Sequence, residues 1–393
     1  MIQYRACQVG SNILIAFCAF AVTATAFIVP GALGFYIIIP NIFFAPLIWW
    51  PIIIGACAIG LALLLTGLLL VYINSVQLGI RWRVIGLACC LIPVVNLAVL
   101  IYIIIITKRE ANSEIRRIKR NKARQYDWVC RTKYPIFMVH GIMWRDGHNL
   151  NYWGRIPEEL ENNGAVIYYG EHNSSSSCEA AAAEISARLK SIVENTGCEK
   201  VNVIAHSKGG LDIRTAIDHM GVAPYIASVT TINTPHRGSE IADYLLNKVP
   251  EKEKNDIAKT YNFFARNLGD KNPDFLAGCM DLQCDVCKER NSRLKDDSNI
   301  YFQSVGSIMK HSINGRMPTN ATQHKLKQLA GENDGLVAEH SFKWGEKYTL
   351  LRCKGLRGIS HLDVIDFNRE NIKGFDVREF YVELVNDLKN RGF

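Results

Sequence analysis

The N-terminal part of this sequence is almost free of charged residues. Between residues 6 and 80 there is no Asp, Glu, Lys, Arg or His, and a second apolar run follows at 84–107 after two arginines. A helix of about 20 apolar residues spans a lipid bilayer, whereas a cleaved signal peptide has a far shorter apolar segment. This length excludes an ordinary soluble domain, and we predict a transmembrane α-helical region at residues 1–107.

The apolar region divides into about three predicted spans, at residues 12–29, 52–73 and 84–106. Residues 30–50 are apolar too, but their glycines, their prolines and the pair Trp49-Trp50 suit a re-entrant or interfacial segment. A fourth span in that stretch stays open. The spans contain no acidic or basic residue, so nothing marks an ion pathway, and we interpret the region as a multi-pass anchor in the cell membrane.

A basic segment follows the last predicted span. Residues 108–124 contain eight basic and two acidic residues, and the formal charge of the whole chain is +8. Most of the positive charge therefore lies beside the membrane, and the near-neutral remainder excludes nucleic-acid binding. We predict a polybasic juxtamembrane linker at 108–130 that contacts anionic lipid headgroups, with the following domain on the cytoplasmic side.

A strand, a tight turn and a helix follow one another around Ser207. Residues 201–206 are typical of a buried strand, and residues 211–220 have the spacing of an amphipathic helix. A serine on a strained strand-to-helix turn is the arrangement called a nucleophile elbow, which needs small residues two positions before and after the serine. Ala205 and Gly209 meet that need. The alternative is a serine that merely caps a helix.

A serine hydroxyl needs a base, an orienting acid and an oxyanion hole before it acts as a nucleophile. Downstream, Asp334 lies in a loop-forming sequence at 332–337, and His361 lies in another at 358–363. Upstream, a strand-like run at 134–139 leads into His140-Gly141, where a backbone N–H can face a developing oxyanion. The order Ser, Asp, His is the one expected after a nucleophile elbow.

With these motifs in place, residues 134–393 resemble a bacterial triacylglycerol lipase family of α/β-hydrolases. The resemblance implies Ser207 as nucleophile, Asp334 as acid and His361 as base, with the backbone amides of Ile142 and Lys208 as the oxyanion hole. The motifs that carry it are His140-Gly141, the turn at 205–209, Thr-Pro-His-Arg-Gly-Ser at 234–239, Asn-Asp-Gly-Leu-Val at 333–337 and His-Leu-Asp at 361–363.

The fold expected for residues 131–393 is an α/β-hydrolase, a parallel-rich sheet with helices on both faces. Residues 249–297 interrupt the alternation of strands and helices, and the resemblance places a lid insertion there. Expected strands lie at 136–139, 165–169, 201–206, 226–232, 301–305 and 348–353, and expected helices at 152–163, 178–193, 211–220 and 375–388.

We expect no cofactor and no metal. The lipases that this sequence resembles commonly hold a calcium ion that braces the histidine loop, and Asp363 matches one of its ligands. The stretch 311–329 contains no Asp or Glu, however, so a second carboxylate is missing and calcium would bind weakly. Asp363 is then expected to accept hydrogen bonds within its loop or to pair with Arg357.

Other cysteines and histidines have plainer interpretations. The spacing of Cys279, Cys284 and Cys287 is compatible with a metal site, but reduced thiols fit a cytoplasmic domain better. His140 is expected to orient the oxyanion loop, and both His206 and His236 are expected to be structural.

The sequence thus predicts a membrane-anchored serine ester hydrolase, a lipase or carboxylesterase, that cleaves acylglycerol-type lipid esters through an acyl-serine intermediate. A phospholipase or lipid acyltransferase using the same triad is the first alternative. A non-catalytic membrane scaffold with a hydrolase-like domain is the second. The oligomeric state stays open.

Overall fold

The computed structural model describes residues 1–38, 45–92, 94–143, 151–267, 269–312 and 315–393. The chain divides into two compact units, Met1–Ala123 and Arg124–Phe393.

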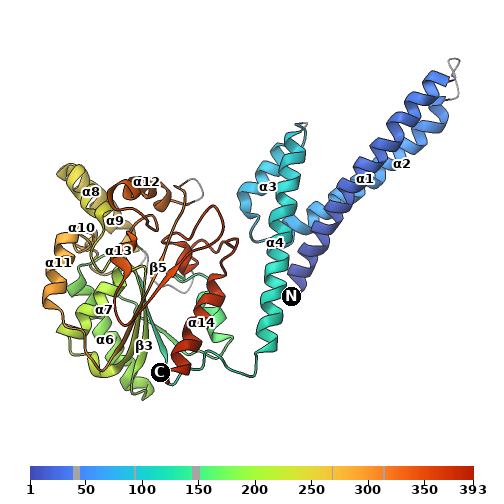
Figure 1. The fold of residues 1–393 in the computed structure, drawn as a ribbon. Helices are drawn as coiled ribbons and strands as arrows, with labels where there is room; N and C mark the ends of the chain where they lie inside the picture. Colours follow the sequence, from blue (N-terminus) through green and yellow to red (C-terminus); the bar gives the residue numbers. More distant parts are fainter. Residues whose placement is uncertain (39–44, 93, 144–150, 268, 313–314) are drawn as a thin grey trace. The chain divides into compact units, whose positions relative to one another are not determined.

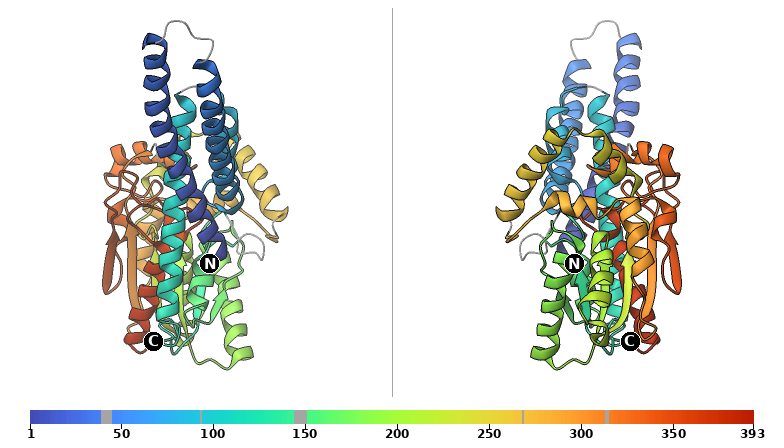
Figure 2. Two further views of the ribbon diagram at one scale, coloured as in Figure 1. Left: turned by 90° about the vertical axis from the view of Figure 1, so that its right-hand side faces the viewer. Right: turned by 90° about the vertical axis from the view of Figure 1, so that its left-hand side faces the viewer.

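The N-terminal unit is helical. Its two longest helices, α1 and α2, run side by side, as both views in Figure 2 show. Two segments, Ile2–Val29 and Trp50–Asn74, are long and apolar enough to cross a membrane by length and composition, and few of their residues are buried. The helices of this unit are α1 (Ile2–Ile38), α2 (Ala45–Asn74), α3 (Gly79–Ala88) and α4 (Val95–Ala123).

The predicted third span at 84–106 is wrong as a single helix, because α3 ends at Ala88 and α4 begins only at Val95. The sequence has a proline at position 93, and the residue before a proline disfavours helical backbone. Val94 has a φ of 68°, a conformation that a β-branched residue rarely adopts. The apolar start of α4 is therefore much shorter than a bilayer-spanning helix.

The predicted re-entrant segment at 30–50 falls partly on residues 39–44, which lie outside the described residues. On either side the chain is helical, as the end of α1 and the start of α2. The polybasic segment continues α4 as far as Ala123. Within it Glu114 is buried and pairs with Arg117 at 2.9 Å.

The C-terminal unit is built on a six-stranded sheet with the order β2-β1-β3-β4-β5-β6. All five strand pairs are parallel. The strands are β1 (Ile136–Val139), β2 (Ile167–Tyr169), β3 (Val201–His206), β4 (Ile226–Ile232), β5 (Tyr301–Ser307) and β6 (Lys347–Leu351).

Helices cover both faces of this sheet, with α6 and α7 on one side and α14 on the other (Figure 1). Side chains of a strand alternate between faces, and β1 shows the consequence. Ile136 and Met138 pack in the core formed with α5 and α14, while Phe137 and Val139 pack in the core formed with α6 and α7. The covering helices are α5 (Ile156–Glu161), α6 (Cys178–Thr196), α7 (Lys208–His219) and α14 (Val377–Asn390).

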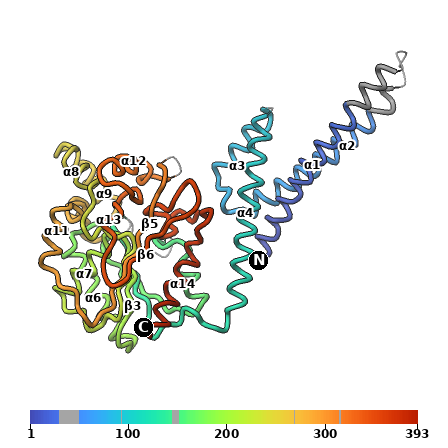
Figure 3. Tube along the Cα trace, in the orientation of Figure 1, coloured from blue at the N-terminus to red at the C-terminus, as the bar shows by residue number. Residues whose placement is uncertain are grey.

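A group of shorter helices gathers at one end of the sheet, beyond the ends of the strands (Figure 1). Four of them follow β4, and the predicted insertion at 249–297 contains three of these. Two more come between β5 and β6 in the chain, and the first of them, α12, lies at the same end of the unit as α8 in Figure 3. These helices are α8 (Glu240–Lys248), α9 (Glu251–Asn267), α10 (Phe275–Met280), α11 (Cys284–Arg293), α12 (Thr319–Ala330) and α13 (Glu339–Phe342).

Candidate active site

Ser207 occupies a sharp turn between β3 and α7. Its φ and ψ are 54° and −129°, a combination that a residue with a side chain rarely adopts. The turn brings the backbone of Gly209 against the end of β1, so that a Cβ there would lie 2.3 Å from the His140 carbonyl oxygen. Only glycine fits at this position. The local geometry is therefore that of a nucleophile elbow.

Asp334 and His361 are in direct contact. The Nδ1 of His361 lies 2.6 Å from Oδ2 of Asp334, and the backbone N–H of His361 donates to the Asp334 carbonyl oxygen at 2.9 Å. The backbone amides of Leu336 and Val337 donate to Oδ1 at 2.9 and 2.8 Å. These contacts fix the carboxylate, and they leave Nε2 of His361 as the nitrogen that can accept a proton.

Asn233 also holds Asp334, a role that none of the sequence motifs predicted. Its Nδ2 donates to Oδ2 of Asp334 and to the Ser307 hydroxyl, each at 2.7 Å. Asn233 has a φ of 48° at the end of β4. Its position in the sequence could have indicated this role, because Asn233 follows a predicted strand and directly precedes the Thr-Pro-His-Arg-Gly-Ser segment.

Ser207 and His361 meet at one cavity of about 360 Å³. No hydrogen bond joins these two side chains within the described part of the chain, and catalytic hydrogen bonds are often long until substrate is bound. Apolar side chains from α8, α9 and α10 form part of the cavity wall, among them Leu245, Ile257 and Phe275. The site therefore offers an apolar chamber beside a buried serine.

The two amides expected to form the oxyanion hole lie beside Ser207. The Ile142 side chain lines the same cavity, and Lys208 begins α7 directly after the serine. Neither amide donates to an acceptor among the residues that the structure describes. Both remain available for an oxyanion, as the first N–H groups of a helix generally are.

A chain of hydrogen bonds connects Gly141, in the loop after β1, to the loop at residues 358–363 that carries His361 (the histidine loop). The Gly141 amide donates to the Tyr152 hydroxyl at 3.0 Å, which donates to Nδ1 of His206 at 2.6 Å. The other ring nitrogen, Nε2, then carries the proton and donates to the His361 carbonyl oxygen at 3.1 Å. Burial lowers the pKa of His206 well below its usual value, with His361 adding to the effect. His206 is thus a neutral bridge next to Ser207.

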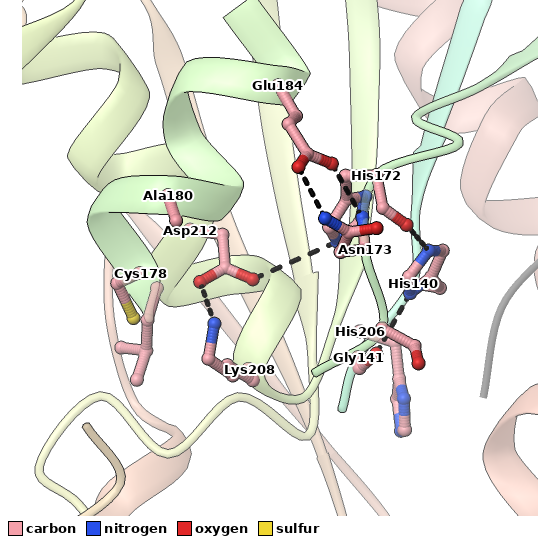
Figure 4. A network of polar contacts seen from close by, with 12 residues as sticks. His140, Gly141, His172, Asn173, Cys178, Ala180, Glu184, His206, Lys208 and Asp212 are labelled. Carbon is pink, nitrogen blue, oxygen red and sulfur yellow. Dashed lines mark hydrogen bonds and ion pairs between the residues drawn. The ribbon is translucent and has the colours of Figure 1, made fainter. Parts of the chain in front are cut away.

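The start of α7 is held from beneath by buried polar groups (Figure 4). Nζ of Lys208 lies 2.6 Å from Oδ1 of Asp212, and both side chains are buried. The second carboxylate oxygen lies 3.9 Å from Nε2 of His172, whose ring stacks on His140 with centroids 3.8 Å apart. Through this network the residues on both sides of the expected oxyanion hole are anchored to one another.

Asp363 does not fit a calcium ligand. Its Oδ1 lies 2.7 Å from the Arg357 guanidinium, and its Oδ2 accepts the Ser360 amide at 3.0 Å. A positive group therefore already occupies the place where a cation would bind. Of the two expectations for Asp363, hydrogen bonds within its loop and pairing with Arg357, the structure has both.

The cysteine cluster does not assemble a metal site either. Among the described residues no three His, Cys, Asp or Glu side chains form a group able to hold a metal ion. Burial raises the pKa of Cys279 to about 12 and that of Cys287 to about 11.

His236, expected to be structural, is buried and its ring stacks on Trp344 with centroids 4.7 Å apart. Its Nε2 lies 2.9 Å from the Thr231 hydroxyl. Burial lowers the pKa of His236 well below its usual value, and the nearby Arg214 and Arg237 lower it further.

The parallel sheet, the elbow at Ser207 and the contact between Asp334 and His361 define an α/β-hydrolase. Comparison with solved structures gives the same fold. Staphylococcus hyicus lipase superposes with a TM-score of 0.53 and 19% sequence identity, over 66% of this chain and 96% of that chain. The predicted fold class is confirmed.

Among sequences, the chain is a relative of triacylglycerol lipases. It is 38% identical to the triacylglycerol lipase of Pseudarthrobacter phenanthrenivorans over 125 residues, 30% of this chain and 38% of that protein. It is 29% identical to triacylglycerol lipase 2 of Saccharomyces cerevisiae over 265 residues, 62% of this chain and 75% of that protein. No protein-family profile matches. The matches to three bacterial triacylglycerol lipases span less than two fifths of those proteins' length.

Proposed function

We propose that this protein is a serine carboxylic ester hydrolase of the lipase type that acts on acylglycerol-type lipid esters. The observation that carries the proposal is the apolar cavity that contains both Ser207 and His361, with His361 bonded to the buried Asp334. Apolar walls suit an acyl chain, and the similarity to triacylglycerol lipases supports the same substrate class.

In the proposed mechanism the Ser207 oxygen attacks the ester carbonyl carbon while its proton passes to Nε2 of His361. The resulting oxyanion accepts hydrogen bonds from the amides of Ile142 and Lys208. The carbon–oxygen bond to the alcohol breaks, and the alcohol leaves with the proton from His361. Water then attacks the acyl-serine, again with His361 as base, and the fatty acid departs from regenerated Ser207.

The test compares the full-length protein with two variants, Ser207→Ala and Ser292→Ala. Ser292 is an exposed serine on α11 and serves as the matched control. We expect a fluorophosphonate probe to label the wild type and Ser292→Ala but not Ser207→Ala. Hydrolysis of short-chain nitrophenyl esters is expected to fall by about 10⁴-fold or more in Ser207→Ala alone. Undiminished hydrolysis by this variant would contradict the assignment of the nucleophile.

The same experiment separates the enzyme from a non-catalytic scaffold. A correctly folded wild type that neither hydrolyses esters nor reacts with the probe would favour the scaffold. A panel of triacylglycerols, monoacylglycerols and phospholipids, assayed with and without an acceptor alcohol, then distinguishes hydrolysis of acylglycerols from phospholipase or acyltransferase activity.

We further propose that the N-terminal unit anchors the protein in the cell membrane. The support is the pair of long apolar helices in that unit, together with the basic residues at 108–124. The basic residues would contact anionic headgroups and place the hydrolase unit on the cytoplasmic side. An alkaline phosphatase fused after residue 393 is expected to be inactive in cells, and an active fusion would contradict this orientation.

A further inference from the structure

Two arginines and two carboxylates form a continuous ionic network beside the histidine loop. The guanidinium of Arg357 contacts Asp363 through Nη2 and Glu370 through Nη1, each at 2.7 Å. Nε of Arg316 donates to the other oxygen of Glu370 at 2.7 Å. The Asp363 side chain is only 2% exposed, whereas those of Arg357 and Glu370 are 24% exposed. Arg357 is thus the bridge between a buried carboxylate and one at the surface.

The buried end of this network is bonded to the residue that precedes His361. Oδ2 of Asp363 accepts the Ser360 amide at 3.0 Å, and the Asp363 amide lies 3.3 Å from the Ser360 hydroxyl. Because the Asp363 carboxylate is held by Arg357, the position of the guanidinium is transmitted to Ser360 and so to the backbone of His361.

Arg357 is itself fixed to the framework of the domain. Its carbonyl oxygen accepts the amide of Lys310 at 3.0 Å, just beyond the end of β5. The amide of Ile359 donates to the Ile308 carbonyl oxygen at 2.8 Å. The pairing of Arg357 with Asp363, called the clamp, therefore connects the histidine loop to the segment that follows β5. The sheet gives this segment a rigid support.

The charges in the network sustain one another. Burial alone would lower the pKa of the Arg357 guanidinium, but the charges of Asp363 and Glu370 outweigh that effect and raise it. Burial would raise the pKa of Glu370, yet Arg316 and Arg357 hold it below its usual value. Removing the guanidinium would leave a carboxylate that is almost fully buried without its cation, which is strongly unfavourable.

We propose that Arg357 is a positioning residue for catalysis, an internal cation that sets the place of the His361 imidazole through Asp363 and Ser360. The inference rests on the proposed function of Ser207 and His361. The fixed Arg357 guanidinium thus supplies the positive charge beside Asp363 that a bound metal cation would otherwise have to supply. A planar guanidinium contacts two carboxylates through two separate nitrogens held in a fixed geometry. A lysine ammonium keeps the charge without that geometry, and an uncharged side chain supplies neither.

The test uses four variants of the full-length protein: Arg357→Ala, Arg357→Lys, Arg357→Met and Arg391→Ala. Arg391 is the matched control, an arginine directly after α14 that pairs with Asp387 of that helix at 3.0 Å. Lysine and methionine both fill the space of the arginine side chain, but only lysine keeps a positive charge. The steady-state constants kcat and KM on a nitrophenyl ester, and Tm, are measured for each protein.

We expect Arg357→Ala and Arg357→Met to lose about tenfold to 100-fold in kcat with little change in KM, because the base is misplaced while the acyl-binding cavity is intact. Arg357→Lys is expected to recover a clear part of kcat, and Arg391→Ala to match the wild type. A purely structural role would be recovered by methionine as well as by lysine.

The outcomes separate this inference from the proposed function. If the folded wild type is inactive, or is as active as Ser207→Ala, the proposed function has failed. If the wild type is active and Ser207→Ala is not, yet Arg357→Ala keeps kcat within about twofold of the wild type, the clamp alone is refuted. Equal kcat values for Arg357→Lys and Arg357→Met would also refute it. If the Arg357 variants lose kcat only in proportion to the folded protein they lose, as judged by Tm, the positioning role of Arg357 is refuted as well.

Discussion

Mild acid is expected to destabilise the hydrolase unit through His206 and His236. Both side chains are at most 2% exposed, and burial lowers the pKa of each well below the ordinary value of 6.5. Between pH 7.5 and 5.5 the unfolded chain takes up a proton at each histidine, whereas the folded chain does not. The unfolded state therefore binds more protons, and stability falls as the pH falls.

The magnitude follows from the titration of a group with a pKa of 6.5 in the unfolded chain alone. Over this interval each histidine costs about 1.4 kcal/mol of unfolding free energy, or about 3 kcal/mol for the pair. For a domain of this size 1 kcal/mol corresponds to about 2–4 °C in Tm. One histidine thus accounts for a fall in Tm of about 3–6 °C.

The assay measures Tm by tryptophan fluorescence at pH 7.5 and 5.5 for the wild type, His206→Gln and His324→Gln. Glutamine at 206 removes the titrating group and keeps a side-chain amide. The fall in Tm between pH 7.5 and 5.5 should therefore be smaller than in the wild type by the amount attributed above to one histidine, about 3–6 °C. His324 is exposed on α12 and serves as the control, with an unchanged fall. If His206→Gln loses as much Tm on acidification as the wild type, the neutral bridge between Tyr152 and the His361 carbonyl is refuted.

Three further outcomes are expected. Asp334→Ala should lower kcat by about 10⁴-fold, far more than Asp363→Ala, because only Asp334 contacts the His361 ring; the reverse order at equal Tm would exchange their roles. Gly209→Ala should prevent stable folding, since its Cβ would lie 2.3 Å from a backbone oxygen, whereas Gly355→Ala, with nothing nearer than 3.3 Å, should give normal yield and Tm. Excess chelator should leave both activity and Tm unchanged, because Arg357 occupies the cation position beside Asp363; a loss restored only by calcium would contradict this.

Much of the sheet could be predicted because its strands are short apolar runs between turn residues. The bounds of β1 and β4 agree with those predicted from the sequence, Ile136–Val139 and Ile226–Ile232. Parallel strands covered on both faces are continuously apolar, so their limits are visible without any partner. The turn at Ser207 was predictable for a different reason, since only small residues fit around it.

What could not be predicted depends on contacts between distant segments. The break between α3 and α4 interrupts an apolar run in which a single proline was the only warning. The Tyr152–His206 contact joins a loop to the end of a strand, and nothing in the spacing of these residues indicates it. The Lys208–Asp212 pair has ordinary helical spacing, but its burial comes from the packing of neighbouring segments. The Arg357–Glu370 contact likewise arises only when the histidine loop has folded.

The order of the strands has a consequence for a chain that is still being synthesised. After β3, each new strand adds beside the one made before it, so the sheet can grow outward from the strand that carries Ser207 toward β6. Asp334 emerges from the ribosome only after β5, and His361 only after β6. On the proposed mechanism, a partly made chain thus carries Ser207 without its base, and it would not hydrolyse lipid esters until the last strand and the loop that carries His361 are in place.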